Sequence, residues 1–304
     1  MLAHLEAGPN AAFRQLAEAS ARLYPTFLHT LRDESGIAVD LRTEGKICFL
    51  DDNPENIAGG KPLIADDLGT LEPELTYRAP AILLPQNSLD PRQLIQALVA
   101  TAKHLGVHLA SGNEVTAVES ADGHITCAET HKTKYSAGII VNCAGAWAGH
   151  ISPTPLPTRP IKGQMLCLVH DRSLITHVIQ GNGVYLIPRT DHRIAIGSTV
   201  EDVGFDKRVD PGTIQLLHQR AASLVPACGQ ALIHDSWAGL RPCLPDHLPA
   251  LGKTSLEGYF VATGHYRDGI LLAPITAHVM SQTIRGEQPD VDLTPFSPLR
   301  FESQ

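Results

Sequence analysis

The segment 259–271 constrains the fold of this chain more than any other, because it has the pattern of a strand, a glycine turn and a helix start. The apolar strand Tyr259–Thr263 precedes Gly264-His265-Tyr266-Arg267-Asp268-Gly269-Ile270-Leu271. The first amides of a helix have no partner within the helix and carry the positive end of its dipole. The sequence therefore predicts a cradle for anionic atoms at this junction.

A second arginine lies upstream, in Trp237-Ala238-Gly239-Leu240-Arg241-Pro242, which we interpret as another turn. Guanidinium groups bind carboxylates through two parallel hydrogen bonds. Arg241 and Arg267 together indicate that the ligand is a carboxylate.

Composition excludes several classes of protein. The chain has 304 residues with 43% hydrophobic and 18% charged side chains, typical of a globular protein with two interlocked domains. A net charge of −8 and the lack of Lys/Arg-rich runs argue against a nucleic-acid partner. No apolar run approaches the roughly 18 residues of a membrane span, and residues 1–6 do not resemble a signal peptide, so we expect a cytoplasmic protein without a membrane partner.

Cysteine and histidine residues do not suggest a metal site. The six cysteines are scattered without a CxxC pair, and we expect buried thiols in a reducing compartment. The pair His104 and His108 is separated by Gly106, a helix-stop residue, so these side chains would not share a helical face. We predict no metal.

Periodicity predicts helices and strands along the whole chain. Asn10 is a plausible N-cap for the first helix, in which Pro25 would introduce a kink or a break. The predicted helices are 10–34, 65–71, 91–105 and 211–224. The predicted strands are 37–42, 45–50, 81–84, 107–110, 114–119, 125–129, 138–142, 164–169, 183–188, 193–198, 231–236 and 259–263.

The order of these elements predicts an α/β (α+β) fold. The β-branched run Gly138–Asn142 suits a strand covered on both faces, as in a parallel sheet. The Pro-rich segment Pro153–Pro160 indicates a connection between domains. We predict an antiparallel substrate domain inserted into a nucleotide-binding domain.

Six segments in this order resemble the FAD-dependent D-amino-acid oxidase family, and most closely its bacterial glycine oxidase branch, which serves thiamine thiazole synthesis. The resemblance implies an FAD-binding, Rossmann-like domain of residues 1–22, 86–152 and 237–304, and a substrate-binding domain of residues 23–85 and 153–236. The six segments are Leu89-Asp90-Pro91, Asn142–Trp147, Lys162-Gly163-Gln164, Val184–Arg189, Trp237–Pro242 and Gly264–Leu271.

One expected motif does not occur between residues 1 and 304: the GxGxxG that follows the first strand of such domains and approaches the pyrophosphate. Residues 1–7 resemble the family segment after the first βαβ unit, which takes about 30 residues. A start codon further upstream and a truncated protein both stay open. We expect the chain expressed from Met1 to bind FAD weakly and to be poorly soluble.

The resemblance also implies roles for particular residues. Arg241 matches the arginine that binds the substrate carboxylate, Tyr185 the tyrosine whose hydroxyl assists it, and Arg267 a second arginine beside the substrate. The implied cofactor-binding residues are Val115, Ala144, Gly145, Gly264, His265, Tyr266, Arg267, Asp268, Gly269, Ile270 and Leu271.

The implied reaction is oxidation of glycine, sarcosine or a small D-amino acid by hydride transfer from Cα to flavin N5, followed by imine hydrolysis to ammonia and a 2-oxo acid. Oxygen would take the electrons and give hydrogen peroxide. A D-amino-acid dehydrogenase with another acceptor and a flavin-free remnant stay open as alternatives. The segment Gln180–Val184 departs from the family pattern before Tyr185, so the size of the substrate stays open. Homo-oligomerisation is possible, and the sequence does not decide it.

Overall fold

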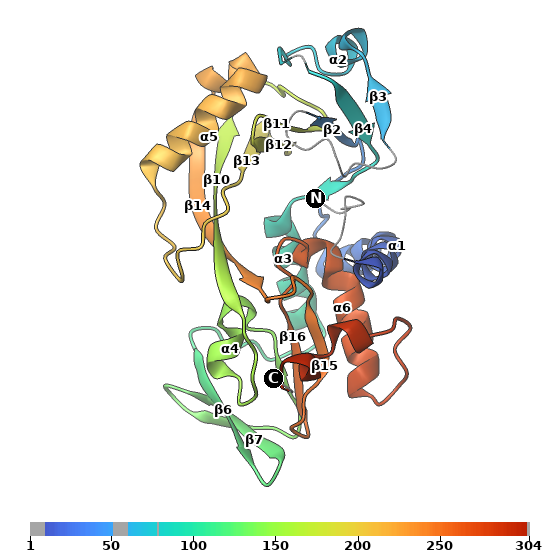
Figure 1. Ribbon diagram of the computed structural model, residues 1–304, viewed down its shortest axis with the longest axis vertical. Helices are drawn as coiled ribbons and strands as arrows, with labels where there is room; N and C mark the ends of the chain where they lie inside the picture. The colour runs from blue at the N-terminus through green and yellow to red at the C-terminus, as the bar shows by residue number, and fades with distance from the viewer. Residues whose placement is uncertain (1–9, 51–59, 78, 303–304) are drawn as a thin grey trace. The chain divides into compact units, whose positions relative to one another are not determined.

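The computed structural model describes residues 10–50, 60–77 and 79–302 (Figure 1). These residues form two compact units. Residues 37–97 and 162–239 contain most of an eight-stranded sheet and form the large-sheet unit. Residues 10–36, 98–161 and 240–302 contain two three-stranded sheets and form the small-sheet unit. The resulting mixed α/β architecture confirms the predicted fold class.

The predicted helices are all present. Asn10 caps α1 by accepting a hydrogen bond from the Phe13 amide at 2.9 Å. Pro25, predicted to introduce a kink or a break, lies inside the continuous helix α1, so the break does not occur. The α-helices are α1 (Ala11–Ser35), α2 (Ala65–Leu71), α3 (Pro91–His104), α4 (Ala148–Ile151), α5 (Pro211–Leu224) and α6 (Gly269–Ile284). The short 3₁₀ helices are η1 (Gly145–Trp147), η2 (Pro226–Gln230), η3 (Thr294–Phe296) and η4 (Pro298–Phe301).

The strands are arranged in four sheets, with orders β14-β10-β13-β12-β11-β2-β4-β3, β15-β16-β9, β6-β7-β8 and β1-β5. They are β1 (Leu41–Arg42), β2 (Lys46–Phe49), β3 (Lys61–Leu63), β4 (Ala81–Leu84), β5 (Ser88–Leu89), β6 (Val115–Ala121), β7 (His124–Thr130), β8 (Lys134–Ser136), β9 (Ile140–Asn142), β10 (Arg159–Val169), β11 (Val178–Gly181), β12 (Val184–Pro188), β13 (Arg193–Gly197), β14 (Leu232–Cys243), β15 (Ala250–Lys253) and β16 (Tyr259–Thr263).

The large sheet has two faces of different character. Strands β11 and β2 run parallel, whereas β10–β13, β12–β13 and β11–β12 pair antiparallel. One face packs its alternate apolar side chains against α5, which lies along this part of the sheet (Figure 1). That core includes Ile47, Phe49, Leu166, Ile179, Leu186, Ile196, Leu217 and Leu224. The opposite face carries polar side chains among its apolar ones.

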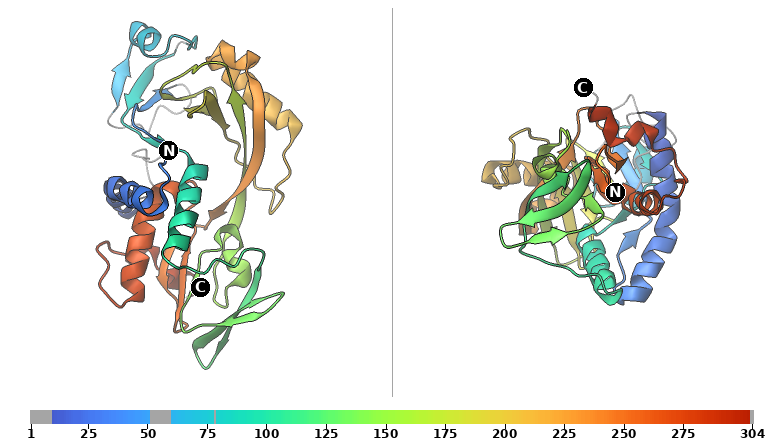
Figure 2. Two further views of the ribbon diagram at one scale, coloured as in Figure 1. Left: turned by 180° about the vertical axis from the view of Figure 1, so that it is seen from behind. Right: turned by 90° about the horizontal axis from the view of Figure 1, so that it is seen from below.

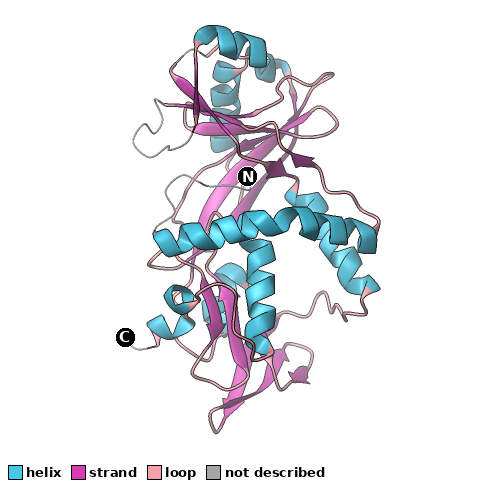
Figure 3. Cartoon of the chain, turned by 90° about the vertical axis from the view of Figure 1, so that its right-hand side faces the viewer, coloured by secondary structure: helices cyan, strands magenta, loops and turns pink. Residues whose placement is uncertain are grey.

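The small-sheet unit is built around the parallel pair β9 and β16, in which Phe260 lies opposite Val141. Tyr259 and Val261 are fully buried in its core together with Leu244 and Ala250. Helices α1 and α6 pack against each other in this unit, as the views from behind and from the side show (Figures 2 and 3).

Three expectations need correction. Residues 237–242 form no turn but continue strand β14, because this edge strand of the sheet tolerates Gly239 and Pro242. Residues 107–110 form no strand, since they pair with no neighbour in the described residues, and Val107 and Leu109 are exposed. Cys143 is exposed, whereas the other five cysteines are buried as expected.

None of the described helices is both long and apolar enough to cross a bilayer.

Candidate functional site

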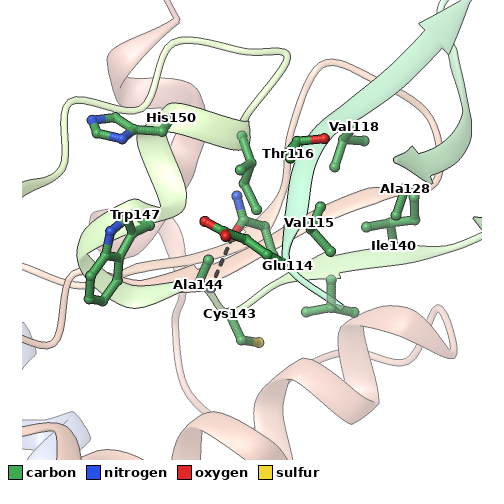
Figure 4. A pocket seen from close by; sticks show the side chains of 13 residues that line it. Glu114, Val115, Thr116, Val118, Ala128, Ile140, Cys143, Ala144, Trp147 and His150 are labelled. Atoms are coloured by element: carbon green, nitrogen blue, oxygen red, sulfur yellow. Dashed lines mark hydrogen bonds between the residues drawn. The ribbon is translucent and has the colours of Figure 1, made fainter. Parts of the chain in front are cut away.

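A pocket of about 610 Å³ lies in the small-sheet unit, between the start of β6 and the turn after β9. Figure 4 shows Val115, Thr116 and Val118 along β6, with Trp147 and His150 from η1 and α4. The pocket brings together two residues that the resemblance assigned to the cofactor, Val115 and Ala144. The lining residues are Glu114, Val115, Thr116, Val118, Ala128, Ile140, Val141, Asn142, Cys143, Ala144, Trp147, His150 and Ile151.

Asn142 holds the turn that lines this pocket. Its side-chain oxygen accepts a hydrogen bond from the Ala144 amide at 3.0 Å, and its Nδ2 donates to the Ala148 carbonyl at 2.9 Å and to the Tyr259 hydroxyl at 2.8 Å. Asn142 is 3% exposed, so its amide group is satisfied by these buried partners. Sequence reasoning assigned no such role to Asn142, although an Asn at the end of an apolar strand is a signal for a side-chain-stabilised turn.

Gly145 begins η1 with φ +59°, in the left-handed region that favours glycine. Its carbonyl accepts a hydrogen bond from the Thr263 hydroxyl at 3.0 Å, which ties this turn to the end of β16. Apart from its two chain neighbours, no atom of the described residues would lie within 4 Å of a Cβ at Gly145. The side of the backbone at Gly145 is therefore open to a ligand.

The turn after β16 is held by close packing. Gly264 has φ +79°, and a Cβ there would lie 2.2 Å from Leu244 Cδ1. The amide of Tyr266 donates to the Pro242 carbonyl at 2.9 Å, and the Tyr266 ring meets His247 edge to face at 5.5 Å. These contacts position the backbone that leads into α6.

The polar side chains of this turn differ in exposure. Arg267 is exposed, and its guanidinium carbon lies 5.1 Å from the Tyr266 ring centre. Asp268 is the N-cap residue of α6, which begins at Gly269. His265 contacts the Thr276 hydroxyl at 3.0 Å, and burial lowers the pKa of His265 to about 4. Its ring is therefore neutral at about pH 7.

The first turns of α6 are supported by α1, which sequence reasoning missed. Pro274 has no amide hydrogen, and the Tyr24 hydroxyl donates to the Ile270 carbonyl in its place. The Ser20 hydroxyl donates to the Leu271 carbonyl at 2.6 Å and accepts from the Ile275 amide at 3.3 Å. The available signal was Pro274 itself, since a proline within a helix leaves a carbonyl that needs another donor.

The two remaining predicted residues belong to different units. Arg241 is half-buried in β14, in the small-sheet unit. Tyr185 is half-buried in β12 of the large-sheet unit and lies across Gly197, where a Cβ would be 2.7 Å from its hydroxyl. The hydroxyl contacts the Met165 sulfur at 3.9 Å.

The sequence of this chain matches the model of the FAD dependent oxidoreductase family over residues 1–283, and the chain belongs to that family. It is 31% identical over 303 residues to a glycine oxidase of Pseudomonas putida, covering 94% of this chain and 83% of the relative. It is 38% identical over 218 residues to the bifunctional protein ThiO/ThiG of Synechocystis sp., covering 70% of this chain. The chain spans about a third of that relative's length.

The fold has solved counterparts. The crystal structure of glycine oxidase from Geobacillus kaustophilus superposes with a TM-score of 0.90 at 30% sequence identity, covering 97% of this chain and 85% of that one. This similarity and the family match confirm the resemblance inferred from the six segments.

The residues present fit part of an FAD molecule. The pocket has a size common among small-molecule and cofactor sites and largely apolar walls, which suit a flat base. The open backbone at Gly145 allows close approach of a ligand.

Proposed function

We propose that this protein oxidises glycine or another small amino acid with FAD as its cofactor. The observation that carries this proposal is the pocket that Val115 and Ala144 both line, in a chain similar over 94% of its length to a glycine oxidase. The ThiO/ThiG relatives support a role in thiamine thiazole synthesis.

Two groups of residues would hold the cofactor. Val115, Ala144 and Gly145 would bind the adenosine end, where small and apolar side chains permit close packing. The turn Gly264–Leu271 would bind the flavin ring, and the first amides of α6 would stabilise the negative charge that builds up on it. FAD supplies the two-electron chemistry when it is bound.

Arg241 is proposed to bind the substrate carboxylate through its planar fork, which fixes the direction of the Cα–H bond. Tyr185 is proposed to donate a hydrogen bond from its hydroxyl to a substrate carboxylate. Arg267 is proposed to add positive charge near the substrate. Orientation is the main contribution of these side chains, since the substrate's neutral amine supplies the electron pair that assists loss of the Cα hydride.

The purified, FAD-loaded protein tests this proposal directly. We expect hydrogen peroxide and ammonia in equal amounts when glycine is added in air. Reduction of an artificial acceptor without peroxide would identify a dehydrogenase instead. A protein that binds FAD and reacts with no amine under either condition would overturn the proposal.

A further inference from the structure

Lys46 and Gln180 form a polar pair on the face of the large sheet that carries Tyr185. Lys46 is fully buried in β2, and its Nζ donates to Oε1 of Gln180 at 3.0 Å. Its cross-strand neighbours in β4 are apolar: Leu84 lies directly opposite Lys46, and Ile82 lies two residues further along β4. Burying an amine among apolar side chains is costly unless it is hydrogen-bonded.

The register of the strands places this pair beside Tyr185. Gln180 in β11 lies directly opposite Tyr185 in β12, so the two side chains share a face. Strand β2 pairs with the edge of β11 that faces away from β12, and there Lys46 lies opposite Val178. The Lys46 side chain extends along β11 to Gln180. Three adjacent strands therefore contribute one polar row, Tyr185–Gln180–Lys46.

The lysine decides which way the glutamine amide points. An ammonium group only donates hydrogen bonds, so the Gln180 atom that faces it is the carbonyl oxygen. The Nε2 group, with two N–H donors, is then directed away from Lys46. Among the residues that the structure describes, Nε2 of Gln180 donates to no acceptor, and Gln180 is half-buried rather than covered.

The Tyr185 hydroxyl and Gln180 lie too far apart for a molecule as short as glycine to reach both. The Tyr185 hydroxyl lies over Gly197 of β13, whereas Gln180 belongs to β11, two strands away. Two strand spacings amount to about 10 Å. A ligand that reaches both Tyr185 and Gln180 needs a second acceptor group beyond the carboxylate at Tyr185.

We propose that Gln180, positioned by Lys46, recognises a second carboxylate in the substrate, carried on the amine nitrogen or on the side chain. Nε2 presents N–H donors from which a carboxylate oxygen can accept a hydrogen bond, and the nearby ammonium favours negative charge. The proposal rests on the proposed function only in assigning the first carboxylate to the Tyr185 end.

Iminodiacetate carries its second carboxylate on the amine nitrogen, whereas D-aspartate carries it on the side chain, so the two compounds distinguish these sources. Glycine is the reference substrate. Gln180→Glu keeps the length of the side chain and an acceptor for Lys46, but it replaces the donors with negative charge. We expect the ratio of kcat/KM for the preferred dicarboxylate to that for glycine to fall about tenfold or more, through KM. Gln215→Glu makes the same chemical change on the exposed surface of α5 and should leave the ratio unchanged.

Lys46→Met tests the positioning role. We expect a smaller fall in the same ratio. Gln180→Leu should lower this ratio less in the Lys46→Met background than in the wild-type protein, because without Lys46 the Gln180 amide is no longer held in position. A merely structural role would lower kcat/KM for glycine and the dicarboxylates equally, and this outcome would overturn the proposal, as would an unchanged ratio in Gln180→Glu.

Calorimetric titration keeps this test independent of turnover. If the FAD-loaded protein oxidises no amine, the proposed function fails, but iminodiacetate and D-aspartate can still be titrated into the wild-type protein and Gln180→Glu. Binding that Gln180→Glu weakens about tenfold supports the second carboxylate site. Equal binding by both proteins, or no binding by either, overturns it.

Discussion

The hydroxyl of Tyr24 donates a hydrogen bond to the carbonyl oxygen of Ile270, the acceptor that Pro274 leaves without a helical donor. The two bonded residues are 246 positions apart in the sequence. Ile270 belongs to the turn that we assign to the flavin, so α1 stabilises the segment in which that turn becomes a helix.

Tyr24→Phe should lower the free energy of unfolding by about 1–3 kcal/mol, because the half-buried carbonyl loses its donor. Urea denaturation followed by circular dichroism measures this loss. In the Pro274→Ala background the same change should cost less, since alanine at that position supplies its own amide to Ile270. Equal costs in both backgrounds would contradict the assignment.

Gly264→Ala should destabilise the protein by about 1–3 kcal/mol and weaken FAD binding, because the new methyl group would overlap Leu244 and the residue has φ +79°. Gly269→Ala is the matched control at the start of α6, where a Cβ would lie 3.6 Å from His265 Cβ, an ordinary contact. Thermal unfolding and flavin absorbance compare the two. A loss in Gly269→Ala as large as that in Gly264→Ala would argue against a packing effect.

Ala144→Leu should weaken FAD binding by about tenfold or more, because the larger side chain fills the pocket between β6 and the turn after β9. Titration of the apoprotein with FAD, followed by quenching of flavin fluorescence, measures the change. Ala137→Leu adds the same volume at an exposed position and should bind FAD as the wild type does. Unchanged affinity in Ala144→Leu would place the adenosine elsewhere.

Arg241→Lys should raise KM for glycine and sarcosine by about tenfold or more, with nearly unchanged flavin content, because lysine keeps the charge but loses the two-pronged geometry. Arg208→Lys, at an exposed arginine paired with Asp206, serves as the control. Wild-type kcat/KM in Arg241→Lys would show that Arg241 does not bind the carboxylate.

The stability of the folded protein should fall in mild acid through His265. Burial holds the pKa of His265 at about 4, below the value of about 6.5 in an unfolded chain. The unfolded state therefore binds the proton more readily, so the contribution of neutral His265 is complete above about pH 6.5 and is lost as pH falls towards about 4. His265→Gln should flatten the Tm profile in this window, whereas His131→Gln, at an exposed site, should not. A profile that is equally steep in His265→Gln would assign the pH dependence to other groups.

Local sequence signals located most helices and strands. Asn10, Pro91 and Asp210 mark helix starts through capping and ring geometry, which act within one turn of the chain. The strand Tyr259–Thr263 and the start of α6 at Gly269 also follow from their own residues. These are short-range effects, so the sequence alone was sufficient.

Other features depended on partners distant in the sequence. Residues 237–242 contain turn-forming residues but lie in β14, because hydrogen bonding at a sheet edge outweighs local preference. The pairing of Gln180 with Lys46 requires β11 and β2 to be parallel neighbours, although the two residues are 134 positions apart. Likewise, Pro274 predicts that one carbonyl of its helix lacks a helical donor. Only the packing of α1 on α6 identifies the Tyr24 hydroxyl as the donor that this carbonyl finds instead. The sequence determined most of the elements and the family, whereas tertiary packing decided which side chains meet, because that depends on register and on contacts that no local pattern records.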